Sequence, residues 1–96
     1  MQERTITISN RLGLHARAAA RLVQCASQFT SRVEIRHSEN DKKADGKSIL
    51  SVLLLAAVNG TTLQVQTEGE DEERAVNAIV KLIEQRFGEE VSDAVY

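Results

Sequence analysis

Apolar and polar residues along the chain follow two periods, and the changes between them divide the sequence into seven elements. A period of two, typical of a strand with one buried face, occurs in four segments. Spacings of three and four residues, which gather apolar side chains on one helical face, occur in three others. The expected strands are residues 4–9, 32–36, 42–45 and 63–68, and the expected helices are residues 16–29, 49–58 and 70–87.

The segment 49–58 fits two structures by its pattern alone. It is apolar apart from Ser51, so a buried strand competes with a helix. Ser48 is a good N-cap, Gly60 is a good helix stop, and the leucine and alanine content favours a helix. We therefore predict a short helix here.

The order of the elements is strand, helix, strand, strand, helix, strand, helix. Because each strand has one apolar face and each helix one apolar stripe, the expected fold packs three helices on one face of a four-stranded antiparallel sheet. The other face is expected to be open to water, and the fold class is α+β. Ninety-six residues without a Pro- or Ser-rich linker are expected to form a single domain, 1–96.

The composition argues against several classes of protein. Twelve basic and 14 acidic residues give a net charge of −2, and aromatic residues make up 3%, so we expect no nucleic-acid partner. No apolar run reaches membrane-spanning length and the N-terminus lacks a signal-peptide pattern, so we expect a cytoplasmic protein without membrane insertion. The single cysteine, Cys25, suits a reducing compartment. Zinc-ligand and nucleotide-loop spacings are absent, so no metal or cofactor is expected.

Candidate chemistry lies at the start of the first predicted helix, in the segment Gly13-Leu14-His15-Ala16-Arg17. A helix N-terminus offers unpaired N–H groups and a partial positive charge, which stabilise an anion by roughly 0.3–1 kcal/mol. Arg17 adds a charge-assisted contact to phosphate oxygens. A neutral imidazole is a nucleophile, and its phosphoramidate keeps a good leaving group. The segment therefore predicts a phosphate site.

Together with a second segment, Gly46-Lys47-Ser48-Ile49-Leu50, this motif resembles the HPr phosphocarrier family of the bacterial phosphoenolpyruvate-dependent phosphotransferase system. The resemblance covers nearly the whole chain and implies an open-faced β-sandwich. It also implies a stoichiometric phosphocarrier, not an enzyme, whose His15 accepts a phosphoryl group at Nδ1 from an enzyme I-type protein. An IIA-type protein then takes the group, which Arg17 steadies. A monomer is expected, since the carrier presents one face to two partners.

One position departs from the family pattern, which usually has proline where this chain has Ala18. We expect the fold to survive, because losing a compatible proline costs only about 0.4–1 kcal/mol. The run Ala18-Ala19-Ala20-Arg21 and the aliphatic second helix resemble the nitrogen-related carriers, called NPr, at least as much as the sugar carriers. The expected role is therefore in sugar uptake or in nitrogen and carbon regulation.

The resemblance also suggests roles for the second helix. Residues 49–55 hold more large aliphatic side chains than one buried face accepts, so some are expected to meet a partner. The resemblance implies that Val52 and Leu55 face the core. It also implies a docking surface around His15 that consists of Leu14, Ile49, Leu50 and Leu53. We expect Arg21 to steer acidic partners, with a solvated charge as the alternative.

Ser48 aligns with a position at which an ATP-dependent HPr kinase phosphorylates some family members. A helix cap without modification is the alternative for this residue. The alternative function for the whole chain is a regulatory binding module, controlled at Ser48 or His15, without sugar transport. Residues 89–96 show no usable pattern, and we expect this segment to fray.

Overall fold

Four strands form one antiparallel sheet in the order β1-β4-β2-β3, in a computed structural model that describes residues 1–89. Fraying is expected for residues 89–96, of which residues 90–96 lie outside the described residues; for Glu89 the expectation is wrong, because its carboxylate contacts Asn10 and His15. The register sets Ile6 opposite Leu63 and Ile35 opposite Val65, so apolar side chains share one face. The strands are β1 (Gln2–Thr7), β2 (Arg32–His37), β3 (Lys43–Asp45) and β4 (Thr62–Glu68).

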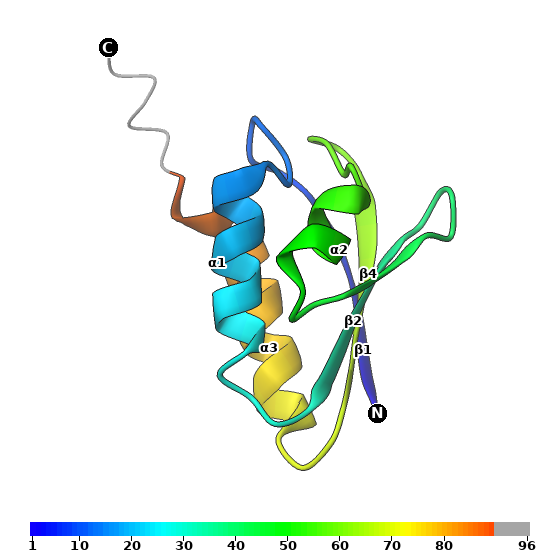
Figure 1. The fold of residues 1–96 in the computed structure, drawn as a ribbon, viewed down its shortest axis with the longest axis vertical. Helices are drawn as coiled ribbons and strands as arrows, with labels where there is room; N and C mark the ends of the chain where they lie inside the picture. The colour runs from blue at the N-terminus through cyan, green and yellow to red at the C-terminus, as the bar shows by residue number, and fades with distance from the viewer. Residues whose placement is uncertain (90–96) are drawn as a thin grey trace.

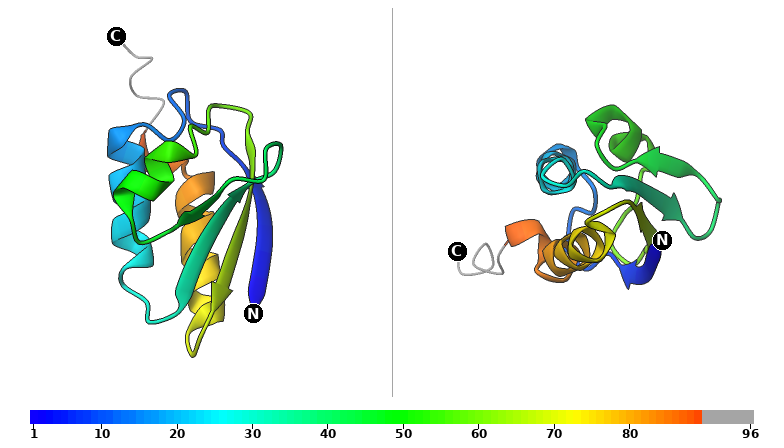
Figure 2. Two further views of the ribbon diagram at one scale, coloured as in Figure 1. Left: turned by 45° about the vertical axis from the view of Figure 1, so that its right-hand side comes forward. Right: turned by 90° about the horizontal axis from the view of Figure 1, so that it is seen from below.

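Three α-helices cover that face of the sheet (Figures 1 and 2), namely α1 (Ala16–Ala26), α2 (Ile49–Leu54) and α3 (Glu72–Glu84). Helix α3 packs on β1 and β4, helix α2 packs on β3, and α1 lies against both other helices. The core between the layers is aliphatic, with Leu22, Ile35 and Ile79 completely buried. The α+β class, the order of the elements and the open sheet are confirmed.

All three helices end earlier than their apolar patterns predict, and the first of them, α1, ends at Ala26 instead of residue 29. Helix α2 ends at Leu54, because Ala56 adopts a left-handed φ of 51° that a continuing helix cannot contain. Helix α3 ends at Glu84, and a single 3₁₀ turn, Arg86–Gly88, follows it. Phe87 nevertheless completes the apolar stripe of α3, because this turn folds back and buries the ring completely. The pattern therefore identified the core residue but not the path of the backbone.

Asp71 fixes the connection between the α1–β2 turn and the start of α3. Its carboxylate accepts hydrogen bonds from the Ser31 hydroxyl and from the backbone N–H groups of Thr30 and Ser31, both N–H distances being 3.0 Å. These bonds, chiefly the one from the Ser31 hydroxyl, lower the pKa of Asp71 to about 2. Within residues 1–89, no helix is both long and apolar enough to cross a membrane.

Candidate functional site

A tight turn before α1 sets the position of His15. Gly13 has a φ of 65°, and its backbone passes so close to Ala57 that a Cβ would lie 2.5 Å from the Ala57 carbonyl oxygen. Leu14 N–H donates to the same oxygen at 2.9 Å. His15 is then the N-cap of α1, and its Nδ1 accepts a hydrogen bond of 3.3 Å from the backbone N–H of Arg17. The imidazole therefore lies at the helix N-terminus, where the sequence predicted it.

The second ring nitrogen of His15 lies against a carboxylate from the other end of the chain. Nε2 contacts Oε2 of Glu89, while Oε1 of Glu89 accepts a hydrogen bond of 2.9 Å from Nδ2 of Asn10. Nδ2 of Asn10 also donates to the Gly13 carbonyl at 2.8 Å. Neither Asn10 nor Glu89 belongs to a motif that the sequence revealed. The sequence offers one local signal, the turn-forming residue Gly88 directly after Phe87.

The two arginines near His15 differ in their surroundings. Arg17 is exposed, and within residues 1–89 its guanidinium makes no hydrogen bond or ion pair, which leaves it available to an anion beside His15. Arg21, one turn further along α1, is half-buried and donates from Nη1 to the Phe87 carbonyl. Its guanidinium thus ties α1 to the turn after α3, a contact that the sequence did not suggest.

The second motif begins helix α2. Ser48 is its N-cap, and the Ser48 hydroxyl accepts a hydrogen bond of 3.3 Å from the backbone N–H of Ser51, which confirms the expected cap. Val52 and Leu55 are buried as expected. Ile49 and Leu50 are 44% and 65% exposed.

The expected docking surface needs one correction, because Leu14 is only 4% exposed and packs in the core. The left-handed Gly13 turns the chain so that Leu14 points inward, while Leu12 remains outside and 64% exposed. Leu53 is half-buried against the core. We call the exposed aliphatic residues of this region the apolar surface, namely Leu12, Ile49, Leu50, Leu54 and Val58.

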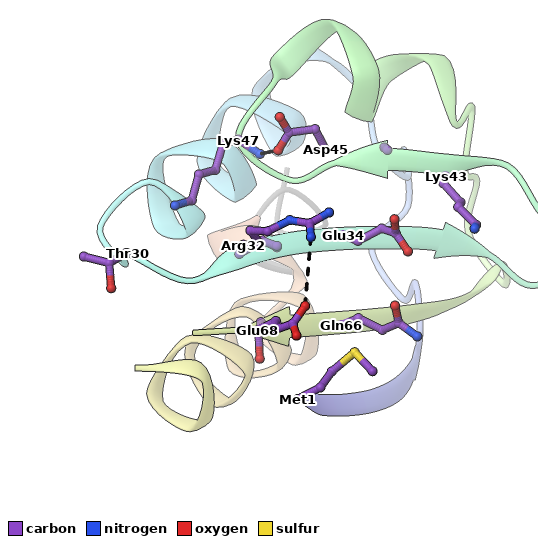
Figure 3. Close-up of a pocket in the computed structure, with 12 residues that line it drawn as sticks. Met1, Thr30, Arg32, Glu34, Lys43, Asp45, Lys47, Gln66 and Glu68 are labelled. Atoms are coloured by element: carbon purple, nitrogen blue, oxygen red, sulfur yellow. Dashed lines mark hydrogen bonds and ion pairs between the residues drawn. The ribbon is translucent and has the colours of Figure 1, made fainter. Parts of the chain in front are cut away.

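A shallow hollow of about 420 Å³ lies on the open face of the sheet, and none of the residues around His15 lines it (Figure 3). Its lining includes three basic and three acidic side chains, and Arg32 lies 3.9 Å from Glu68. This balance gives the hollow no preference for phosphate. The charged side chains of the hollow are Arg32, Glu34, Lys43, Asp45, Lys47 and Glu68.

No group of three or more His, Cys, Asp or Glu side chains within residues 1–89 is arranged to hold a metal ion.

Comparison with known proteins gives the same family from sequence and from structure. A family profile described as "PTS HPr component phosphorylation site" matches residues 2–85. Phosphocarrier protein HPr of Cupriavidus necator is 48% identical over 89 residues, covering 93% of this chain and 98% of that protein. Phosphocarrier protein NPr of Shewanella violacea is 41% identical over 87 residues, covering 91% and 93%.

A solved structure, the crystal structure of HPr-C-His from Thermoanaerobacter tengcongensis, matches with a TM-score of 0.88 and 45% identity, covering 95% of this chain and 100% of that one. The matches span the sheet, all three helices and both motifs. Because sequence and fold agree over this whole span, with His15 at the start of α1, the chain belongs to the HPr family of phosphocarrier proteins of the phosphotransferase system.

Proposed function

We propose that this single domain carries a phosphoryl group on Nδ1 of His15, accepting it from an enzyme I-type protein and passing it to an IIA-type protein. As a member of its family the chain is a phosphocarrier and not an enzyme. The observation that supports His15 is the position of its ring, whose Nδ1 faces the first N–H groups of α1. A phosphoryl group on Nδ1 would therefore meet backbone donors that lack partners within the helix.

The weakness of this site suits a carrier. The hydrogen bond from Arg17 N–H to Nδ1 is 3.3 Å long and therefore weak, so little free energy is lost when the phosphoryl group replaces it. The helix N-terminus then stabilises the group by roughly 0.3–1 kcal/mol. Tight stabilisation of the phosphorylated state would slow transfer to the next protein. Modest stabilisation leaves both transfers reversible.

Arg17 is the residue that we propose steadies the phosphoryl group. Its guanidinium is exposed and has no partner within residues 1–89, and it lies on the first turn of α1 beside His15. A guanidinium can donate two parallel hydrogen bonds to phosphoryl oxygens. Steering of acidic partners by Arg21 stays a prediction, beside the observed hydrogen bond of Arg21 to the Phe87 carbonyl.

We propose that the apolar surface, together with half-buried Leu53, is where both partners dock in turn. Gly13 contacts the backbone of Val58, which brings the turn before His15 next to the segment after α2. Exposed aliphatic side chains around a polar nucleophile fit a small transient interface of less than about 1,200 Å². A monomer in the cytoplasm would present this one surface to each partner.

Ser48 is a proposed regulatory site for an ATP-dependent kinase. The residue is half-buried at the start of α2 and directly precedes exposed Ile49 and Leu50. A phosphate there would add about −1.5 to −2 charges at the edge of the apolar surface and weaken docking.

Intact mass after incubation with phosphoenolpyruvate and catalytic enzyme I tests the proposal. We expect one acid-labile phosphoryl group on the wild type, its removal by an IIA-type protein, and no gain in a folded His15→Ala variant. An unchanged gain in His15→Ala would show that another residue is the acceptor. No gain in folded wild-type protein would favour the regulatory binding module.

A further inference from the structure

A strained turn after α3 folds back to the start of α1. Arg86, Phe87 and Gly88 follow one another with φ values of 57°, 56° and 75°, and two of them are not glycine. The left-handed region is unfavourable for residues other than glycine, so other contacts must hold the turn. The completely buried ring of Phe87 and the hydrogen bond from Arg21 to the Phe87 carbonyl supply them. Figure 1 shows this segment beside α1.

The turn brings Glu89 to His15 and anchors its carboxylate. Only 17% of the Glu89 side chain is exposed, and its two oxygens are divided between Nε2 of His15 and Nδ2 of Asn10. The Asn10 amide donates both of its N–H groups, one to Glu89 and one to the Gly13 carbonyl. The positions of Nδ2 and Oδ1 of Asn10 follow from these contacts, because a flipped amide would turn its oxygen toward two acceptors, the Gly13 carbonyl and the Glu89 carboxylate.

The anchoring of Glu89 has a measurable cost. Oδ1 of Asn10 is buried and has no hydrogen-bond partner within residues 1–89. A buried acceptor without a hydrogen-bond partner lowers the stability of the fold. A buried amide held in this orientation, together with two left-handed residues, therefore points to a specific placement of the Glu89 carboxylate.

We infer that Glu89 is a positioning residue that fixes the tautomer of His15, an inference that rests on the proposed phosphorylation of this histidine. A carboxylate accepts hydrogen bonds and cannot donate them, so Nε2 of the neutral imidazole carries the proton and donates to Glu89. Nδ1 accepts from Arg17 N–H and carries the lone pair. The nucleophilic nitrogen thus faces the helix N-terminus.

This tautomer allows phosphoryl transfer without any proton transfer. The Nδ1 lone pair forms the new N–P bond while the bond between phosphorus and the donor breaks, and that electron pair leaves with the donor. The Nε2 proton stays against Glu89, whose negative charge faces the positive charge that the ring acquires. In the onward step the N–P bond breaks and its electron pair returns to Nδ1.

A Glu89→Gln variant distinguishes this role from simple packing. Asn10 offers only donors to residue 89, so the single side-chain oxygen of glutamine would face Asn10 and its amide N–H₂ would face Nε2 of His15. Nε2 must then accept, which moves the proton to Nδ1 and blocks the nucleophile. We expect the kcat/KM of phosphorylation by enzyme I to fall by at least about tenfold, since an amide that imposes the wrong tautomer on a histidine is severely damaging in other sites. Glu89→Ala, which imposes no tautomer, should lose less.

The test combines nitrogen NMR of the His15 ring with the rate of phosphorylation. Glu84→Gln is the matched control, because it removes the same charge from an exposed position at the end of α3. We expect the proton on Nε2 in the wild type and in Glu84→Gln, a shift toward Nδ1 in Glu89→Gln, and slower phosphorylation in that variant alone. Equal urea midpoints for the two glutamine variants would separate this effect from unfolding.

Three results would overturn the inference. These are a wild-type proton on Nδ1, an unchanged tautomer in Glu89→Gln, or a changed tautomer with an unchanged rate. The ring proton is observed in the unphosphorylated protein. Failure of His15 to accept phosphate would therefore be seen separately, as a failure of the proposed function.

Discussion

Replacing Gly13 with alanine tests how the turn before His15 is built. A Cβ at Gly13 would lie 2.5 Å from the Ala57 carbonyl oxygen and 2.8 Å from Cα of Val58, both below the 3.0 Å that real Cβ atoms respect. Both obstacles are backbone atoms, which cannot rotate away as a side chain does. Gly60 is the matched control, since its φ is also positive, at 92°, but nothing lies within 4 Å of its Cβ position.

The difference between the two variants follows from the contacts. At either position alanine meets a left-handed backbone, which costs roughly 1–2 kcal/mol, and recovers about 0.4–1 kcal/mol from the stiffer unfolded chain. At Gly13 the Ala57 carbonyl must also move, which breaks its 2.9 Å hydrogen bond with Leu14 N–H. The N–H left without a partner adds about 1–3 kcal/mol. We expect Gly13→Ala to be less stable than Gly60→Ala by this last amount or more.

Urea unfolding followed by circular dichroism measures the difference. With an m value of about 1–2 kcal/mol/M for a small domain, the midpoint of Gly13→Ala should lie about 0.5–3 M below that of Gly60→Ala. Phosphorylation of His15 should also slow in Gly13→Ala, because the displaced turn carries the imidazole. Coincident unfolding curves for the two variants would refute the proposed close approach of Gly13 to Ala57.

Two further variants test other parts of the structure. Asp71 has a folded-state pKa of about 2 against an ordinary 3.8, so its contribution to stability is present above pH of about 4 and is lost as the pH falls toward 2. In Asp71→Asn the urea midpoint should therefore depend less on pH over that range. A pH dependence equal to that of the wild type would contradict the hydrogen bonds from Thr30 and Ser31. Ser48→Asp, with negative charge beside Leu50, should raise the KM of enzyme I for the carrier and leave kcat nearly unchanged. An unchanged KM, with Ser48→Ala as control for loss of the cap, would count against docking at the apolar surface.

The elements of the fold were predictable because their apolar periods are strong, but their ends were not. The alternation of Leu63, Val65 and Thr67 identifies a strand whatever its neighbours are. The ends of α2 and α3 depend on left-handed backbone at Ala56 and at Arg86 and Phe87, residue types that carry no signal for that conformation. Tertiary packing imposes the turn there: the ring of Phe87 is buried in the core.

The site was predictable only where it is local in sequence. His15 and Arg17 lie two residues apart, so the start of α1 places both, and one motif contains them. Glu89 lies 74 residues from His15 and reaches it through a strained turn, which no local pattern encodes. Leu14 was misplaced for a similar reason, since the φ of Gly13 decides which leucine of the turn points inward.

The position of phosphorus on the His15 ring tests the central claim most directly. It is measured by phosphorus–nitrogen coupling in the ¹⁵N-labelled carrier after phosphorylation by enzyme I. Phosphorus bonded to Nδ1, with the proton still on Nε2 against Glu89, is the expected result. Phosphorus bonded to Nε2, or to any residue other than His15, would contradict the proposed mechanism.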